Sequence, residues 1–343
     1  MSTQQKISVS PHIHSGKSTS GIMLDVLIAL LPATVAGLLL FGLQAALVVG
    51  VCVASCVLFE LVFNLLAKKD MTITDLSAAV TGLLLGLNLP VTIPIWQCVI
   101  ASLFAIVVVK CLFGGIGQNV VNPAITARVF MLVAFSGTMT GIAYTAPITP
   151  DAVAGATPLS AEKMPDLLTL FLGNHGGSIG ETCAAALLLG FVYLLVRRVI
   201  TWQVPVVFVG TVFLFSLFME ADVALLQYDF AALINSVLNS DLGDVMGSLW
   251  TLIFNLIEPA LKMVLSGGLL LGAIFMATDY VTSPPTAWGK VIFGLGCGLM
   301  TCLLRYFSGL PEGVSYAILF MNILNPYICN WTKHKVFGEG GAQ

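Results

Sequence analysis

Apolar residues occur along this chain in long runs that short polar stretches separate. Ten such runs can be recognised, at residues 22–42, 45–66, 75–89, 95–112, 120–135, 181–200, 204–220, 261–277, 287–307 and 313–331. A helix needs about 20 apolar residues to cross the hydrocarbon core of a bilayer. The pattern therefore predicts an all-α integral membrane protein with ten transmembrane helices.

The third and eighth runs are shorter than the others, at about 15 apolar residues each, and they end near Pro90 and Pro284. A segment too short to span commonly stops within the membrane, where its end faces a cavity. We therefore expect two broken helices beside an internal cavity.

The same landmarks recur in both halves of the chain. Gly82–Gly86 reads Gly-Leu-Leu-Leu-Gly, and so does Gly268–Gly272; a Thr-x-Pro turn, a long apolar run and a Phe-x-Gly sequence follow each copy. Because five spans per half is an odd number, the halves must be inverted relative to each other. Transporter-like folds with inverted repeats place a binding site near the bilayer midplane.

Basic residues are distributed unequally between the two sides of the predicted topology. With the N-terminus inside, the cytoplasmic side receives Lys6, Lys17, Lys68, Lys69, Lys110, Arg197, Arg198, Lys290, Lys333 and Lys335. The outer side receives only Lys163 and Lys262. Positive residues favour the cytoplasmic side, so we expect both termini in the cytoplasm.

This topology divides the chain into five parts: a cytoplasmic tail (1–21), a first five-helix repeat (22–135), an extracytoplasmic loop (136–180), a second repeat (181–332) and a cytoplasmic tail (333–343). The second repeat contains an acidic outer loop at 221–258, in which residues 249–252 suggest an interfacial helix.

Composition agrees with a membrane protein. Hydrophobic residues make up 58% of the 343 residues and charged residues 9%, whereas about a quarter of an ordinary soluble domain is charged. The net charge of −3 gives no sign of a nucleic-acid partner. The eight cysteines lie mostly in apolar runs without a CxxC pair, which favours packing residues over metal ligands. Any iron–sulfur centre is expected in another subunit.

Asn119, Asn122 and Arg128 are candidate site residues at the start of the fifth run. If this turn is helical, the two amides share a face and could hydrogen-bond a flat polar heterocycle; Pro123 suits a first helical turn. An arginine at this depth must face a partner or a cavity. The alternative is a capped helix start with Arg128 paired to a carboxylate such as Asp75 or Asp279.

Thr278 and Asp279 follow the short eighth run. Asp279 could bind a cation, accept hydrogen bonds from a ligand, or only cap the next turn. Asp25 and Glu60 are ionisable residues at membrane depth, where they are candidates for ion or proton movement. The pair His12 and His14 lacks further nearby ligands, which favours a solvated tail or a docking strand over a metal site.

Thr157 lies in the polar loop 136–180, among small residues and prolines that keep a backbone open. Its hydroxyl could be reached by a modifying enzyme, or the segment could simply be a turn rich in small residues. The chain has no P-loop, dinucleotide fingerprint or hydrolytic triad, so NADH is not expected to bind here.

Together these residues resemble the family of the D subunit of the Rnf complex, an ion-translocating ferredoxin:NAD oxidoreductase. They are similar, less closely, to the B subunit of the sodium-pumping NADH:quinone oxidoreductase. The resemblance rests on Ser10-Pro11-His12, Leu30–Ala33, Gly86–Pro90, Asn122-Pro123-Ala124 with Arg128, Gly155-Ala156-Thr157, and Ala277–Pro284. The quinone-reductase protein is longer at its N-terminus, which favours the ferredoxin-linked complex.

The resemblance implies that Thr157, in the sequence with Asp151, Gly155 and Ala156, carries FMN through a phosphoester made by a flavin transferase. It also implies a second, non-covalent flavin, riboflavin, bordered by Asn119, Asn122 and the region of Asp279. The implied fold is similar to that of urea transporters, and the implied partners are the iron–sulfur and flavin subunits of the complex. Two residues depart from the family pattern: Ala154 replaces a small polar residue, and Tyr280 replaces a proline.

These features predict a membrane subunit that relays electrons through flavins while the whole complex moves Na⁺ or H⁺. A subunit of a sodium-pumping quinone reductase is the alternative within the same class. A passive solute channel with the same fold is the alternative from another class, and the loop at Thr157 distinguishes it, because a channel has no use for such a loop.

Overall fold

The computed structural model describes residues 18–69, 71–140, 158–159, 164–227, 242–308 and 313–333. Within these ranges every regular element is helical, which confirms the all-α class. The elements are α1 (Thr19–Ala67), η1 (Ile73–Asp75), α2 (Ser77–Leu87), α3 (Ile95–Leu103), η2 (Phe104–Cys111), α4 (Pro123–Ala134), α5 (Ser136–Met139), α6 (Leu167–Leu172), α7 (Ala184–Val196), α8 (Gln203–Gln227), α10 (Leu242–Leu265), α11 (Leu269–Leu271), η4 (Gly272–Met276), α12 (Ala287–Phe307) and α13 (Val314–Trp331).

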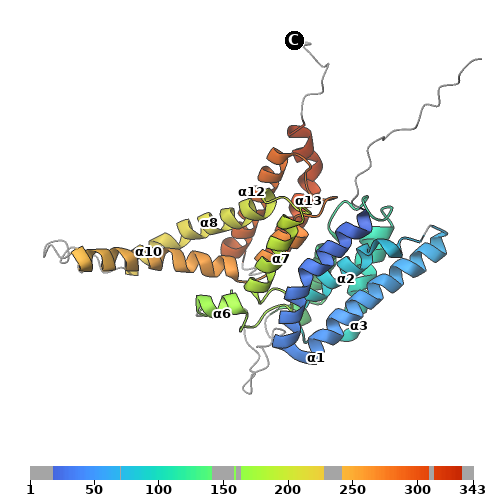
Figure 1. Cartoon of the computed structure of the whole chain (residues 1–343), viewed down its shortest axis with the longest axis horizontal. Coiled ribbons are helices and arrows are strands. Elements are labelled where there is room, and N and C mark those ends of the chain that lie inside the picture. The colour runs from blue at the N-terminus through green and yellow to red at the C-terminus, as the bar shows by residue number, and fades with distance from the viewer. Residues whose placement is uncertain are drawn as a thin grey trace, which may run out of the picture.

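Helix α1 consists of two arms. Its 49 residues would extend about 74 Å if straight, more than twice the hydrocarbon thickness of a bilayer. Gly42 breaks it with φ 71° and ψ −154°, a conformation that glycine adopts without steric penalty. Figure 1 shows the two arms as a V in two shades of blue. The arms correspond to the first two predicted spans.

The helical lengths and compositions are those of a membrane protein. In the described residues, α1, the Gln203–Glu220 part of α8 and α12 are long and apolar enough to cross a membrane. Ile253–Leu265 and Leu269–Met276 add one broken span bent by 64°. Shorter apolar helices occur at Ser77–Leu87, Ile95–Cys111, Pro123–Ala134 and Ala184–Val196. Each of the ten predicted segments overlaps a helix.

The repeated Gly-Leu-Leu-Leu-Gly sequences lie in α2 and at the α11–η4 junction, where neighbouring helices pack closely against the glycines. A Cβ added to Gly82 would lie 2.7 Å from the Cα of Val53 in α1, and one added to Gly272 would lie 2.7 Å from Cγ1 of Val314. Small residues at both places allow the short helices to sit deep in the fold.

A buried irregular segment, residues 175–182, separates α6 from α7. The N–H of Ile179 donates to the carbonyl of Leu89 at 3.3 Å, and that of Gly180 donates to Leu87 at 2.8 Å. These bonds satisfy non-helical backbone inside the protein. The predicted sixth span, 181–200, therefore begins too early, because helix α7 starts at Ala184.

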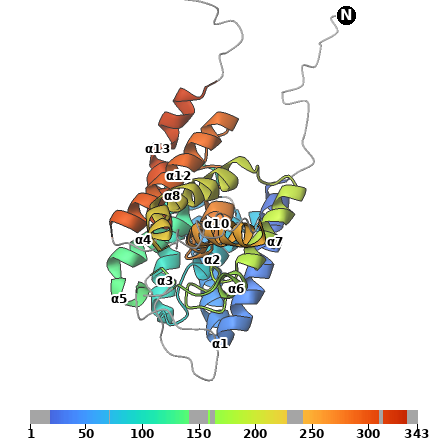
Figure 2. The same cartoon turned by 90° about the vertical axis from the view of Figure 1, so that its left-hand side faces the viewer.

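Helix α10 is longer than the interfacial helix expected within the acidic loop. It begins at Leu242, packs along α8 and leads directly into the break before α11. In Figure 1 both helices project from the rest of the protein, and Figure 2 views them from that side, between α4 and α5 on the left and α7 on the right.

Helix α12 has Lys290 near its start and Arg305 near its end. The two ends of the molecule are called the Lys290 end and the Arg305 end after these residues. At the Lys290 end, Lys290 Nζ donates to Thr201 Oγ1 at 3.1 Å and Thr286 Oγ1 donates to Thr332 Oγ1 at 2.8 Å. At the Arg305 end, the Arg305 guanidinium donates to the carbonyl of Met263 at 2.7 Å. The start of α1 and the end of α13 both lie toward the top of Figure 1.

Candidate functional site

A cavity of about 350 Å³ lies among α1, α2, α4, α7 and the turn after η4. This size is within the usual range for small-molecule sites. Its walls are mainly apolar, with Leu84, Leu194 and Phe275 among them. Its polar lining residues include Ser77, Lys110, Asn119, Asn122, Thr278 and Asp279. The structure thus brings four of the predicted site residues to one cavity.

Asn122 fixes two elements that border the cavity. Its Oδ1 accepts from the N–H groups of Ala124 at 3.0 Å and Ile125 at 3.3 Å, which caps α4. Its Nδ2 donates to the carbonyl of Met276 at 3.2 Å. Pro123 occupies the first turn, as predicted. Asn122 therefore joins the start of α4 to the end of the second broken helix.

Asn119 does not share a helical face with Asn122, because residues 118–122 form no helix. Its Nδ2 donates to the carbonyl of Val121 at 3.1 Å. The shared face depended on a helical turn, and this turn is not helical. Both amides nevertheless line the cavity.

Asp279 lies in the turn between η4 and α12. Its carboxylate accepts from the Val281 N–H at 3.4 Å and from Thr282 Oγ1 at 3.3 Å, so it orders its own turn as well as lining the cavity. Burial raises the pKa of Asp279, while bonds from Val281, Thr282 and Asn119 lower it. The net result is a pKa above the ordinary value. Neighbouring Thr278 donates to the carbonyl of Ile274 at 2.6 Å.

Asn322 in α13 is a buried neighbour of this turn that no sequence pattern singled out. With its amide oriented to satisfy both groups, Asn322 donates to the carbonyl of Thr282 and accepts from the Asn122 N–H, each at 3.2 Å. It joins the turn of Asp279 to the start of α4.

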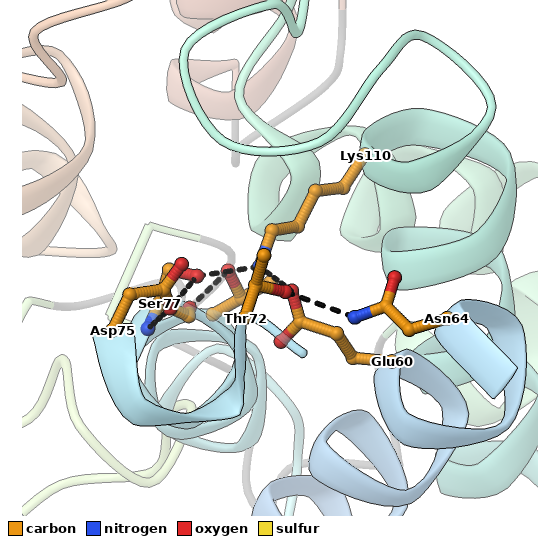
Figure 3. Close-up of polar contacts among 7 residues, drawn as sticks. Glu60, Asn64, Thr72, Asp75, Ser77 and Lys110 are labelled. Carbon is orange, nitrogen blue, oxygen red and sulfur yellow. Dashed lines mark hydrogen bonds and ion pairs between the residues drawn. The ribbon is translucent and has the colours of Figure 1, made fainter. Parts of the chain in front are cut away.

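A buried ionic network adjoins the cavity (Figure 3). Lys110 Nζ lies 2.8 Å from Glu60 Oε1 and donates to Ser77 Oγ at 2.6 Å. Ser77 in turn donates to Asp75 Oδ1 at 2.5 Å, and Thr72 Oγ1 donates to Glu60 Oε1 at 3.1 Å. Glu60 and Lys110 are only 2% and 3% exposed. Loss of either side chain would therefore leave the other as a buried charge without its counter-ion, which is strongly destabilising.

The sequence identified Glu60 as an ionisable residue at membrane depth, whereas Lys110 was expected only as a cytoplasmic charge. Its apolar neighbours Val109 and Cys111 were the one signal that Lys110 is buried. Asp25 differs from Glu60, because it pairs with the exposed Arg197 at 3.2 Å and accepts from Tyr193 at 3.0 Å. The two acids predicted at membrane depth therefore have different surroundings.

Arg128 lies outside the cavity lining, in a second polar cluster. Its Nη1 donates to Asn88 Oδ1 at 2.6 Å, and its Nη2 lies 3.5 Å from Glu181 Oε2 and 3.3 Å from Ser178 Oγ. All four residues are buried. The alternative prediction of an arginine paired with a carboxylate is confirmed, but the carboxylate is that of Glu181. Asp75 and Asp279, which were given as examples, bond within their own turns.

The Arg128 cluster reaches the break between α10 and α11. A Cβ on Gly268 would lie 3.0 Å from Glu181 Oε2, and one on Gly267 would lie 2.9 Å from Leu159 Cδ1 and 3.3 Å from Arg305 Nη2. Pro158 is buried. The segment that directly follows Thr157 in sequence is therefore fixed at the Arg305 end.

Several predicted residues lie outside the described ranges: Asp151, Ala154, Gly155, Ala156 and Thr157 in the loop, and His12 and His14 in the tail. The eight cysteines are all free. Within the described part of the chain, no group of three His, Cys, Asp or Glu residues could hold a metal ion.

Comparison with known proteins gives matches over nearly the whole chain. Residues 6–338 match the family described as NQR2, RnfD, RnfE. The D subunit of the Na⁺-translocating ferredoxin:NAD⁺ oxidoreductase complex of Acetobacterium woodii is 43% identical, covering 97% of this chain and 95% of its own. The D subunit of the proton-translocating complex of Clostridium ljungdahlii is 38% identical, with 97% and 96% covered. The D subunit of the ion-translocating oxidoreductase complex of Stutzerimonas stutzeri is 37% identical, with 94% and 93% covered.

Proposed function

Because the chain belongs to the NQR2, RnfD, RnfE family, we propose that it is the D subunit of an ion-translocating ferredoxin:NAD⁺ oxidoreductase complex. The observation that carries this proposal is the similarity to D subunits over nearly the whole chain, at 43% and 38% identity. The same relatives favour it over a quinone-reductase component and over a passive channel. One of them is named for Na⁺ and another for protons, so both ions remain candidates. The chain is an electron relay, and the ferredoxin and NAD sites belong to partner subunits.

Thr157 is the proposed attachment residue for FMN, within the sequence that contains Asp151, Gly155 and Ala156. Support comes from the motif and from its neighbours, since Pro158 is buried and Leu159 packs beside Gly267 at the Arg305 end. A covalent tether needs no tight pocket for the ring, so the attached flavin can exchange electrons with a partner.

A second, non-covalent flavin is proposed for the cavity. The apolar walls suit the faces of a flavin ring, and Asn119, Asn122, Thr278 and Asp279 offer donors and acceptors for its polar edge. Flavins supply one- and two-electron chemistry, which a protein adjusts through hydrogen bonds and nearby charge. Arg128 acts on this site indirectly, through the contacts of Asn88 and Met276 that lead to Asn122.

The two proposed flavin positions lie toward opposite ends of the molecule. The cavity includes Tyr280 and Val199, near the Lys290 end, whereas Leu159 lies at the Arg305 end. Arg305 lies fifteen positions after Lys290 in α12, or about 22 Å further along the helix axis. Two flavins at these positions would therefore carry electrons across much of the thickness of the bilayer.

The finer architecture follows the same proposal: ten transmembrane helices in two inverted five-helix repeats, similar to urea transporters, in the cell membrane. The Lys290 end is the cytoplasmic end, and both termini lie there. Exposed Trp202, Trp288 and Trp331 near Lys290 support a membrane–water boundary at this end. Lipid, the iron–sulfur and flavin subunits of the complex, and a flavin transferase are the proposed partners.

In-gel fluorescence tests the covalent flavin. The chain is co-expressed with a flavin transferase, denatured, separated by electrophoresis and viewed under ultraviolet light. We expect a fluorescent wild-type band, no fluorescence for Thr157→Val, and full fluorescence for the control Thr140→Val. Mass spectrometry of the loop peptide should give the added mass of FMN. A dark wild-type band with an unmodified peptide would refute the attachment and favour the channel.

A further inference from the structure

A second, smaller cavity adjoins the proposed flavin cavity on the Lys290 side. Its volume is about 150 Å³. Val199, Ile200, Thr278 and Tyr280 line both cavities, so the two spaces meet across a single wall. A ligand that fills the larger cavity could extend into the smaller one past these residues.

The two cavities differ in chemistry. The larger one is mostly apolar with a few amide and carboxylate groups, which suits a flat ring. The smaller one also has apolar residues, among them Val204 and Pro284, but it adds the hydroxyls of Thr201 and Ser283 and the ammonium group of Lys290. Hydroxyls and an ammonium group are hydrogen-bonding partners for a chain of alcohols.

Tyr280 occupies the wall between the cavities. Its hydroxyl donates to the carbonyl of Val199 across the junction, and its side chain remains 56% exposed. The phenol is thus held at one point while its ring stays accessible. A side chain in this place determines how much room a ligand has to pass from one cavity into the other.

We propose that the two cavities form one flavin site, with the isoalloxazine ring in the larger cavity and the polyol chain in the smaller one. This inference rests on the non-covalent flavin proposed above and specifies its orientation. Thr201 and Lys290 bind the polyol chain, and Tyr280 is a specificity-determining residue at the junction. A space of about 150 Å³ is enough for a short polyol chain.

The whole complex is the material for the test, because the chain functions within it. Purified complex is diluted, and bound non-covalent flavin is followed over time by filtration and acid extraction. Because partner subunits also carry flavin, the quantity compared is the difference in release between wild type and each variant of this chain. Co-purification of the partner subunits reports separately that each variant is assembled, and the proposed covalent fluorescence at Thr157 reports that the chain was matured. Thr201→Val, Tyr280→Ala and Tyr280→Phe are compared with Thr211→Val, whose hydroxyl donates to Val207 in α8 and lines neither cavity.

We expect Thr201→Val to release flavin about 3- to 10-fold faster than wild type, since one hydrogen bond to the polyol is lost. Tyr280→Ala should accelerate release at least as much, and Thr211→Val should not. If Tyr280→Ala fails to assemble, Tyr280→Phe keeps the ring and tests the hydroxyl alone, with faster release again expected.

Two results overturn the proposal in different ways. Flavin release that is equally fast in wild type and in all variants refutes the two-cavity orientation but leaves the flavin site intact. A wild-type complex with covalent fluorescence but without extractable flavin refutes the second flavin itself.

Discussion

The Arg128 guanidinium donates to the side-chain oxygen of Asn88, with Nη1 and Oδ1 2.6 Å apart. Asn88 directly follows the short helix α2, and its amide lies 3.5 Å from the sulfur of Met276, the last residue of η4. The ends of α2 and η4 therefore lie close together beside one buried cation. Arginine is costly at membrane depth, and this arrangement gives it Glu181, Asn88 and Ser178 as partners.

Removal of the Arg128 charge should destabilise the protein strongly. Arg128→Met leaves Glu181 as a buried carboxylate without its cation, and breaking a buried pair typically costs about 3–5 kcal/mol. Thermal unfolding of the purified complex, followed by loss of assembly, measures this effect. Arg197→Met is the control, because Arg197 pairs with Asp25 at an exposed position and should matter little.

The double variant Arg128→Met/Glu181→Met sharpens this test. Because it removes both charges together, it should recover part of the stability that Arg128→Met loses. Equal stability of Arg128→Met and Arg197→Met would contradict the role assigned to the buried pair.

Two glycines of α1 provide a second prediction. A Cβ on Gly37 would lie 2.5 Å from the carbonyl oxygen of Ile179 in the buried segment 175–182, whereas a Cβ on Gly50 would meet nothing within 4 Å. Gly37→Ala should therefore lower the free energy of unfolding by about 1–3 kcal/mol through overpacking. Gly50→Ala should be neutral or stabilising, because alanine favours a helix. Similar melting temperatures for the two variants would argue against the close contact.

The sequence predicted the helices well because hydrophobic runs determine them directly. It also selected Asn119, Asn122 and Asp279, which the structure brings to one cavity, because polar residues beside broken helices are informative. It could not identify Glu181 as the partner of Arg128. That pairing depends on the segment 175–182 folding back onto α2, and one sequence contains no record of such a distant contact.

Lys110 and Asn322 were missed for a related reason. Lys110 lies near the end of an apolar helix, where a basic residue usually snorkels to the cytoplasm, and only its position beside Glu60 makes it buried. Asn322 lies among apolar residues of α13, and its two bonds join segments far apart in the sequence. Tertiary position, not residue type, decides both roles.

Asn122 allows its two structural roles to be separated. Asn122→Asp keeps an oxygen that can cap α4 but loses the Nδ2 donor to Met276, whereas Asn122→Ala loses both. Loss of an N-cap alone costs about 1 kcal/mol. We expect Asn122→Ala to reduce the melting temperature and the non-covalent flavin content together. Thr126→Val, on the same helix, is the control; unchanged flavin content in both Asn122 variants would exclude Asn122 from the cavity's function.

The side of the membrane on which each end lies can be tested by labelling. The proposed topology places Ser18 and Thr332 on the cytoplasmic side, because the start of α1 and the end of α13 lie at the Lys290 end (Figure 1). Ser308 follows α12 at the Arg305 end and should face the opposite side. Each of the three residues is replaced by cysteine in a separate variant. Right-side-out and inverted vesicles that contain each variant are then treated with a membrane-impermeant maleimide. Ser18→Cys and Thr332→Cys should be labelled only in inverted vesicles, and Ser308→Cys only in right-side-out vesicles. The wild type, whose own cysteines are mostly buried, measures the background labelling. Labelling of Thr332→Cys and Ser308→Cys from the same side would contradict α12 and α13 as spanning helices, and reversal of all three would place the flavin cavity on the outer side.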